Sequence, residues 1–327
     1  MERNGICVAG SLIADRFYEV DSYPKEGFLS TVRSSAMHIG GTGNLILDLA
    51  KLDRDLVVKA SAVVGEDQSG KELLNVLNRY DNIDTADIVC EGESSVTMVM
   101  NASDTKQRTF FFIPGASDVF DESKIHWDNI KSRIFHLEYL LLMKRVDAND
   151  PEYGTHGARI LARAKAEGMI TSFDMVSEQS NRVKEVVHPA LKFTDICCIN
   201  ESEAQAITGI EVVSRETAEL ALCELHRLGV SRWAVIHSPK HNYGYDATLD
   251  EMVCVDSLKL PEGYIKGTTG AGDAFCSGIL YGAHCSDTLE NSMKLAIACA
   301  ACSLSESNGT DGMRRLEETL SLIEQYS

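Results

Sequence analysis

Residues 267–275 read Gly-Thr-Thr-Gly-Ala-Gly-Asp-Ala-Phe, and this stretch decides the fold. Small residues at 270–272 let the backbone approach an anion closely, and the apolar and small residues after Asp273 suit a packed helix. A helix that begins here presents free N–H groups to a phosphate, and its macrodipole adds partial positive charge. A carboxylate in such a place would repel a phosphate, unless it is a base that removes a proton from an attacking hydroxyl. The alternative is a glycine-rich turn capped by an aspartate.

The same stretch, near the end of a chain of about this length, resembles the signature of the ribokinase-like (PfkB) family of sugar and nucleoside kinases. Further matches occur in the order that this family requires. They are Gly10–Asp15, the pair Gly40-Gly41 with Asn44, Gly65–Gly70, and the Asn-x-x-Glu of Asn200 and Glu203. The resemblance therefore covers nearly the whole chain.

The resemblance implies an α/β fold with a three-layer α/β/α core, a mostly parallel central sheet and a small β-sheet lid. Short apolar runs alternate with amphipathic stretches, which independently indicates βαβ units and a parallel sheet. Two segments, at about 17–38 and 95–114, break this alternation, and the second has the pattern of a β-hairpin. We expect a single kinase domain over residues 1–327, with these two segments as its lid.

Individual elements follow from the apolar periodicity. We expect strands at 6–9, 57–64, 134–142, 170–174, 195–199 and 233–237, and helices at 43–52, 71–80, 153–167, 217–228, 271–284 and 290–305.

Composition restricts the class of protein. The 327 residues, 44% of them hydrophobic, suffice for a sizeable core. A net charge of −18 argues against a nucleic-acid partner, and the apolar runs fall short of membrane-spanning length. The 10 cysteines are scattered through apolar segments without a signal peptide, which predicts reduced thiols and a cytoplasmic protein.

Phosphoryl transfer requires positioning, charge neutralisation and an oriented nucleophile. We expect Asp273 to be the general base for a substrate hydroxyl. The amides of Gly270, Ala271 and Gly272 would form the anion hole for the transferring group. Thr269, which precedes them, is a candidate nucleotide-binding residue. Asn308, after the 290–305 helix, is a candidate for the adenine pocket.

Asn200 and Glu203 follow an apolar strand, so they lie at its carboxyl end, where open α/β sheets bind ligands. The resemblance implies that they organise Mg²⁺ through water beside the phosphates of ATP, a role that suits oxygen ligands. It also allows a monovalent cation. The alternative is a helix N-cap formed by Asn200 with Glu203 in the first turn.

Five residues are candidates for sugar binding. Asp15 follows a buried strand and could accept two vicinal hydroxyls, or be a solvated aspartate at a strand end. Gly40 and Gly41 could let the backbone approach a sugar, with Asn44 supplying an amide, or they only form a tight entry to a helix. Glu138 is an unusual charge among apolar neighbours, and either reaches the sugar or points out of an edge strand.

The chain departs from the family pattern at several places. Gly267 stands where the family usually has an aspartate, three residues before the anion-hole glycine. The Gly-Gly…Asn element is one residue shorter than its common form. Ser238–Gly244 occupies the place of a nucleotide loop that often reads Gly-x-x-Gly. Gly65–Lys71 has P-loop spacing, but Glu72 follows where Ser or Thr must bind Mg²⁺, so we reject a P-loop.

The leading hypothesis is an ATP- and Mg²⁺-dependent kinase that phosphorylates a hydroxymethyl group of a small sugar. A nucleoside kinase of the same fold is the second hypothesis. A non-catalytic sugar or nucleotide sensor is a third, motivated by Gly267 and Pro239. An exposed lid sheet would also make a homodimer natural.

Overall fold

A large sheet runs through the computed structural model, which describes residues 3–105, 107–178 and 182–326. Its strands are β1 (Ile6–Val20), β3 (Val58–Val64), β4 (Ile83–Asp84), β5 (Val89–Cys90), β8 (Ile134–Leu140), β11 (Ile170–Met175), β12 (Ile196–Asn200), β13 (Trp233–His237), β14 (His241–Asp246) and β15 (Glu251–Asp256). The order is β15-β14-β13-β12-β11-β8-β1-β3-β4, and β5 also pairs with β3. Pairing is parallel from β4 to β13 and antiparallel for β14 and β15.

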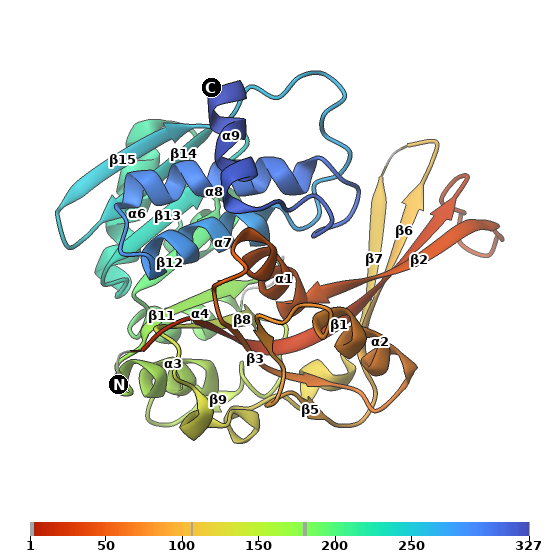
Figure 1. Cartoon of the computed structure of the whole chain (residues 1–327), viewed down its shortest axis with the longest axis horizontal. Helices are drawn as coiled ribbons and strands as arrows, with labels where there is room; N and C mark the ends of the chain where they lie inside the picture. Colours follow the sequence, from red (N-terminus) through yellow and green to blue (C-terminus); the bar gives the residue numbers. More distant parts are fainter. Residues whose placement is uncertain (1–2, 106, 179–181, 327) are drawn as a thin grey trace.

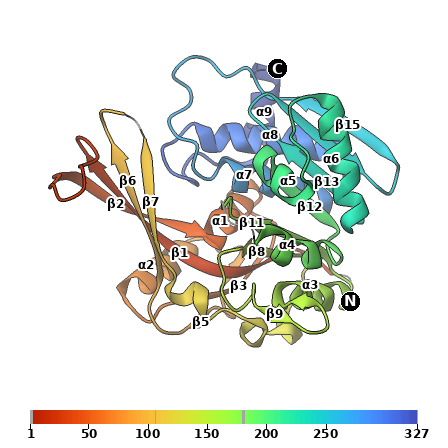
Figure 2. The same ribbon diagram turned by 180° about the vertical axis from the view of Figure 1, so that it is seen from behind.

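Helices cover both faces of this sheet (Figure 1). On one face lie α1 (Thr42–Leu52), α2 (Gln68–Leu77), α7 (Ala271–His284), α8 (Leu289–Leu304) and α9 (Leu316–Tyr326). On the other face, seen in Figure 2, lie α3 (His156–Ala166), α4 (Val183–Leu191), α5 (Glu201–Thr208) and α6 (Arg215–Leu228). Each face of the sheet packs on its helices in a separate hydrophobic core, and alternate residues of β1 belong to the two cores. Ile6 and Val8 lie in the core with α1 and α7, and Cys7 and Ala9 lie in the core with α3 and α4. The expected three-layer α/β/α core is confirmed.

A second, smaller sheet projects from this body (Figure 1). It begins in β1, whose residues from Ile13 to Val20 pair antiparallel with β2 (Val32–Gly41) and parallel with β6 (Ser95–Ala102). β7 (Arg108–Ile113) completes it as the partner of β6, which confirms the expected hairpin. We call β2, β6, β7 and residues 13–20 the projecting sheet. The strand expected at 6–9 is therefore too short, because β1 continues into the projecting sheet.

Helix caps explain where several expected boundaries shift. The helix expected at 71–80 begins at Gln68, because the Asp67 side chain accepts a hydrogen bond from the Gly70 amide. The helix expected at 153–167 begins at His156, because Thr155 caps it in the same way.

Several elements were not expected from the sequence. They are the β14–β15 hairpin, α4, α9, the short pair β9 (Asn149–Asp150) and β10 (Gly154–Thr155), and the 3₁₀ turns η1 (Gly115–Asp118), η2 (Glu122–Lys124) and η3 (Trp127–Asn129). In the described part of the chain, every helix is too short or too polar to cross a membrane.

Candidate active site

The first turn of α7 forms the centre of the site. Gly270 is its N-cap in the left-handed region, with φ 78°, and α7 begins at Ala271. A Cβ at Gly270 would lie 2.4 Å from the Cα of Gly309, so only glycine fits both the conformation and the space. Asp273 lies in the first helical turn beside the free backbone amides.

Two side chains hold the Asp273 carboxylate. Asn44, in the first turn of α1, donates from Nδ2 to Oδ2 at 2.9 Å. The Tyr139 hydroxyl, at the end of β8, donates to Oδ1 at 2.5 Å. Burial raises the pKa of Asp273, and the hydrogen bonds from Tyr139 and Asn44 partly oppose this shift. The carboxylate is thus oriented and has a raised affinity for a proton, as a general base requires.

Two further carboxylates face Asp273 from the ends of neighbouring strands. One ligand atom each of Glu138 (β8), Asp174 (β11) and Asp273 lie within 4.8 Å of one another. Burial is the main cause that raises the pKa of both Glu138 and Asp174, and the nearby carboxylates add to it. We call these three residues the carboxylate cluster.

Glu138 is 1% exposed, and β8 lies between β1 and β11 inside the sheet. The alternative of a glutamate pointing out of an edge strand is therefore wrong. Its Oε2 lies 3.1 Å from Nε2 of His136, whose pKa burial lowers to about 3, so this histidine is neutral. Among the described residues, Glu138 Oε1 has no hydrogen-bond partner.

Asp15 joins the same end of the sheet from β1. The pKa of Asp15 is raised to about 7, chiefly by burial. A hydrogen bond from Thr97 lowers this pKa, and the charge of Asp273 raises it further. A Cβ at Gly40 would lie 2.2 Å from Asp15 Oδ2, so the glycine makes room for this carboxylate. Gly41 has φ 61°, and its Cβ would lie 2.4 Å from the Ser11 carbonyl oxygen. Gly41 is thus required by close backbone packing and its positive φ, whereas Gly40 leaves space for the Asp15 side chain.

Asn200 and Glu203 form a capping box at the start of α5, which is the alternative considered from the sequence. Asn200 Oδ1 accepts from the Glu203 amide at 2.9 Å. Glu203 Oε2 accepts from the Asn200 amide at 2.9 Å, and Oε1 accepts from the Ser177 hydroxyl at 2.5 Å. Both carboxylate oxygens are therefore already hydrogen-bonded.

A cavity of about 720 Å³ opens at the α7 N-terminus, a size typical of small-molecule sites. Ala271 and Gly272 form part of its wall, so it adjoins the turn that carries Asp273. Most of the wall is apolar, and it includes Leu258, Leu260, Ile265, Phe275, Ile297 and Leu304. The polar residues of the wall come from the ends of β12 and β13, the start of α5, β14 and the segments that follow β15 and precede α7; they are Asn200, Glu201, Ser202, His237, Ser238, Asn242, Ser257, Lys259 and Thr268. The turn at 238–242 thus contributes to the wall without the Gly-x-x-Gly pattern.

Two expected nucleotide-binding residues lie outside the wall of this cavity. Asn308 uses its side chain within its own turn, accepting from the amides of Thr310 and Asp311 and donating to the Asp311 carboxylate. Asn308 is not among the residues that line this cavity, and its side-chain amide already serves its own turn. Thr268 lines the cavity instead of Thr269, whose hydroxyl accepts a hydrogen bond from Arg108.

The sequence matches the model of the pfkB family of carbohydrate kinases over residues 3–315. The chain belongs to this family. It is a kinase that transfers a phosphoryl group to a sugar hydroxyl. A ribokinase of Haemophilus influenzae is 22% identical, and the match covers 98% of this chain and 99% of that protein.

Solved structures show the same fold. The Arabidopsis thaliana ribokinase complexed with ribose and ATP matches with a TM-score of 0.79 at 20% identity, over 99% of each chain. A nucleoside kinase of Methanocaldococcus jannaschii matches with a TM-score of 0.75 at 17% identity, over 99% of this chain and 100% of that one.

Four residues at or beside the site were not identified from the sequence: Tyr139, Asp174, Asp48 and Arg108. Asp174 ends an expected strand, so the rule that ligands bind at strand ends could have found it. Asp48 follows Asn44 by one turn of an otherwise apolar helix, and it is fully buried with both carboxylate oxygens unpartnered among the described residues. Tyr139 gives no signal, because a tyrosine in an apolar strand is ordinary.

Proposed function

We propose that this protein transfers the γ-phosphoryl group of ATP to a hydroxymethyl group of a small carbohydrate. One observation carries the proposal: Asp273 stands in the first turn of α7 close to Glu138 and Asp174, and the neighbouring Ala271 and Gly272 line a cavity large enough for a nucleotide. A hydroxyl on the cluster side and a phosphate on the cavity side would meet at this turn. The Arabidopsis ribokinase whose fold is similar was solved with ribose and ATP.

In this proposal Asp273 accepts the proton of the acceptor hydroxyl. Asn44 and Tyr139 orient its two oxygens, and the raised pKa prepares it to take the proton. The amides of residues 270–272 stabilise the negative charge on the transferring group, aided by the α7 dipole.

The acceptor would be held by Asp15, Glu138 and Asn44, with Gly40 and Gly41 shaping the wall. Support comes from Glu138 Oε1, a buried acceptor without a partner among the described residues. A buried acceptor without a partner is costly, so a sugar hydroxyl that donates to it would be bound strongly.

Mg²⁺ would supply charge neutralisation beside the phosphates. The donor set suits it, because Asn200 lines the cavity, Glu203 is its partner in the capping box, and both carry hard oxygen atoms. Both Glu203 oxygens already accept hydrogen bonds, so we propose that these residues act on the ion through water. Gly267 offers no carboxylate to a monovalent cation, and the proposal does not require one.

We propose that the chain is a single cytoplasmic kinase domain and that the projecting sheet is its lid. Closure would exclude water, which would otherwise accept the phosphoryl group. The sheet also exposes large apolar side chains, with Phe110 at 57% and Phe111 at 44%, and Phe28, in the loop between β1 and β2, is 75% exposed. A second copy of the chain that covers these side chains would form a homodimer.

A nucleoside acceptor is the second candidate. Phe17 follows Asp15 by two residues on β1, so both side chains face the same side of the projecting sheet. A half-buried ring beside the proposed hydroxyl-binding carboxylate could stack on a base.

The test is ADP release from Mg·ATP across a panel of pentoses, hexoses and nucleosides, with ³¹P NMR of the product. We expect one sugar class to give a phosphomonoester on a primary hydroxyl. Preference for nucleosides over free sugars would favour the second candidate. If the protein bound a sugar and ATP but released no ADP, only the hypothesis of a non-catalytic sensor would remain.

A further inference from the structure

Arg108 connects the projecting sheet to the turn that precedes α7. It is the first residue of β7, and its Nη1 donates to the Thr269 hydroxyl, one residue before the α7 N-cap. Its Nη2 donates to the Ser307 carbonyl oxygen at 3.3 Å. The guanidinium also lies over the Phe17 ring, 5.8 Å from the ring centroid. These described partners are a hydroxyl, a carbonyl and a ring, so none of them neutralises the guanidinium charge.

Acidic side chains lie beside the first turn of α7. The carboxylate cluster lies on the acceptor side of the turn, with the charge of Asp15 beside it. On the cavity side, Lys259 is the one lysine or arginine among the lining residues that the structure describes. His237 lines the cavity too, but burial lowers its pKa to about 4, so it is neutral. A phosphoryl group that moves toward three carboxylates therefore gains from a positive group that the body of the protein supplies poorly.

Gly267 explains why Arg108 is left without an acidic partner. An ideal Cβ at Gly267 would lie 3.0 Å from the Ser307 carbonyl oxygen, the same atom that accepts from Arg108 Nη2. An aspartate at this position would place its carboxylate close to the guanidinium and form an ion pair with it. The glycine avoids that pair.

We propose that Arg108 is a catalytic residue: its guanidinium leaves Thr269 and binds the non-bridging oxygens of the phosphoryl group during transfer, and Gly267 keeps it free to do so. The proposal rests on the proposed function. In the transfer step, the acceptor oxygen forms a bond to the γ-phosphorus while the bond from that phosphorus to the bridging oxygen breaks. The bridging electron pair leaves with ADP, and the hydroxyl proton goes to Asp273. Arg108 gains and loses no atoms, and only donates hydrogen bonds.

The first test compares Arg108→Ala and Arg108→Lys with the wild type in steady-state kinetics, with ATP affinity from calorimetry. We expect kcat to fall about 10²–10³-fold in Arg108→Ala, as for other cations that contact a transferring phosphoryl group. ATP affinity should change less than about threefold, because the contact forms during transfer. Lysine should restore only part of kcat, because it lacks the planar fork.

Arg33→Ala is the matched control. Arg33 is an arginine of the same projecting sheet, 61% exposed and paired with Asp21. Its loss should leave kcat unchanged.

The second test uses the glycine. Gly267→Asp should lower kcat in the wild-type background by about tenfold or more, because the new carboxylate holds Arg108 away from the phosphate. The same change should have little further effect in Arg108→Ala. Gly267→Ala controls for crowding against the Ser307 carbonyl and should have the smaller effect.

A third readout is independent of the acceptor. ADP with aluminium fluoride imitates the transferring group, and Arg108→Ala should weaken its binding about 100-fold more than it weakens binding of ADP alone. A structural role for Arg108 predicts equal weakening of both and a lower melting temperature. An Arg108→Ala variant with wild-type kcat would overturn the proposal while the proposed function stands. If the wild type phosphorylates nothing in the panel, both proposals fail together.

Discussion

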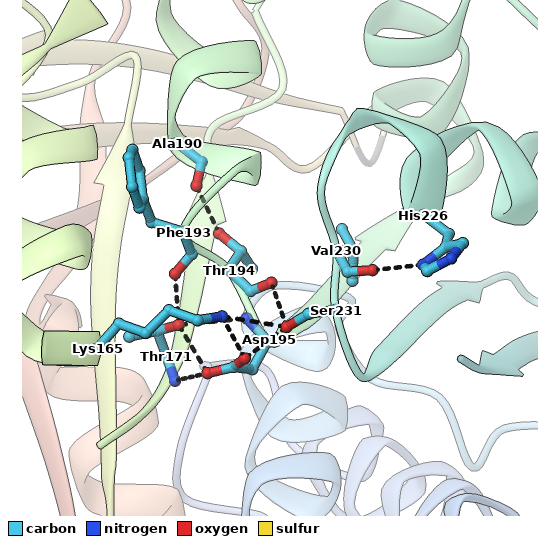
Figure 3. Close-up of polar contacts among 9 residues, drawn as sticks. All are labelled: Lys165, Thr171, Ala190, Phe193, Thr194, Asp195, His226, Val230 and Ser231. Atoms are coloured by element: carbon cyan, nitrogen blue, oxygen red, sulfur yellow. Dashed lines mark hydrogen bonds and ion pairs between the residues drawn. The ribbon is translucent and has the colours of Figure 1, made fainter. Parts of the chain in front are cut away.

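Carboxylates at the two ends of the central sheet have pKa values that are shifted in opposite directions. At the amino ends of β11, β12 and β13, Asp195 accepts hydrogen bonds from Lys165 and Ser231 at 2.5 Å each, and from the amide and hydroxyl of Thr171 (Figure 3). Burial alone would raise the pKa of Asp195, but these hydrogen bonds outweigh it and lower the pKa. At the carboxyl ends of β8 and β11, Glu138 and Asp174 have raised pKa values, chiefly because they are buried.

The difference separates a structural carboxylate from functional ones. Asp195 joins the ends of three strands, and each of its oxygens has a donor, so its charge stabilises the folded state. Glu138 keeps an oxygen without a partner among the described residues, so its burial costs stability until a ligand supplies the donor. The same residue types therefore contribute to the fold at one end of the sheet and to binding at the other.

The largest expected effect comes from Asp273→Asn. Turnover should fall about 10²–10⁴-fold, the usual contribution of a general base, with little change in ATP affinity. Steady-state kinetics with the best acceptor of the panel, together with ATP calorimetry, measure both quantities. Near-full activity of the variant would remove Asp273 from the mechanism.

Glu138→Gln should act on the acceptor alone. We expect kcat/KM for the acceptor to fall about 10–100-fold, because a hydrogen bond to a charged or buried group is worth about 1.5–3 kcal/mol. KM for ATP should stay unchanged, because the cavity wall does not include Glu138. Asp195→Asn serves as the control at the opposite end of the sheet, and neither KM should change in it. If Glu138→Gln lost affinity equally for the acceptor and for ATP, the assignment of Glu138 to the acceptor alone would be contradicted.

Asp195→Asn should instead lower stability by about 1–3 kcal/mol at pH 7 while kcat is kept. Because the pKa of Asp195 is lowered by folding, its contribution is present above the unfolded pKa and is lost as the pH falls through the folded pKa. Urea unfolding at pH 7 and pH 4 should show a smaller difference between variant and wild type at pH 4. If the difference in unfolding free energy were the same at pH 7 and pH 4, the charge of Asp195 would not contribute to stability.

Asp48→Asn should give the opposite pH dependence. The pKa of Asp48 is raised by burial and by the charge of Asp273, and Lys51 partly opposes the shift. A group with a raised folded pKa costs stability as the pH rises above its unfolded pKa, up to the folded pKa. Between these two pKa values, the free energy of unfolding of the variant should rise relative to that of the wild type by about 1.4 kcal/mol per pH unit. Melting temperatures from pH 4 to 8 check this, and a variant that loses stability toward pH 8 would contradict it.

The motifs predicted the family and most of the fold because each depends on local chemistry. Gly270 was predicted at a helix N-terminus, since a glycine without a side chain and the apolar run after Asp273 favour that position over a simple turn, and it is the N-cap of α7. Glu138 was left open between a sugar contact and an edge strand, because sequence does not give the order of strands. The N-cap role of Asn200 was considered and is present, and its proposed role at the metal is a separate prediction.

The sequence by itself determined the alternation of strands and helices, the helix start at Gly270 and the presence of a carboxylate in its first turn, because these depend on residues close together in the chain. The tertiary structure decided which distant groups meet there. Tyr139 approaches Asp273 across 134 positions, and Arg108 approaches Thr269 across 161. Such contacts depend on strand order and on the path of the projecting sheet, which follow from the packing of the whole chain.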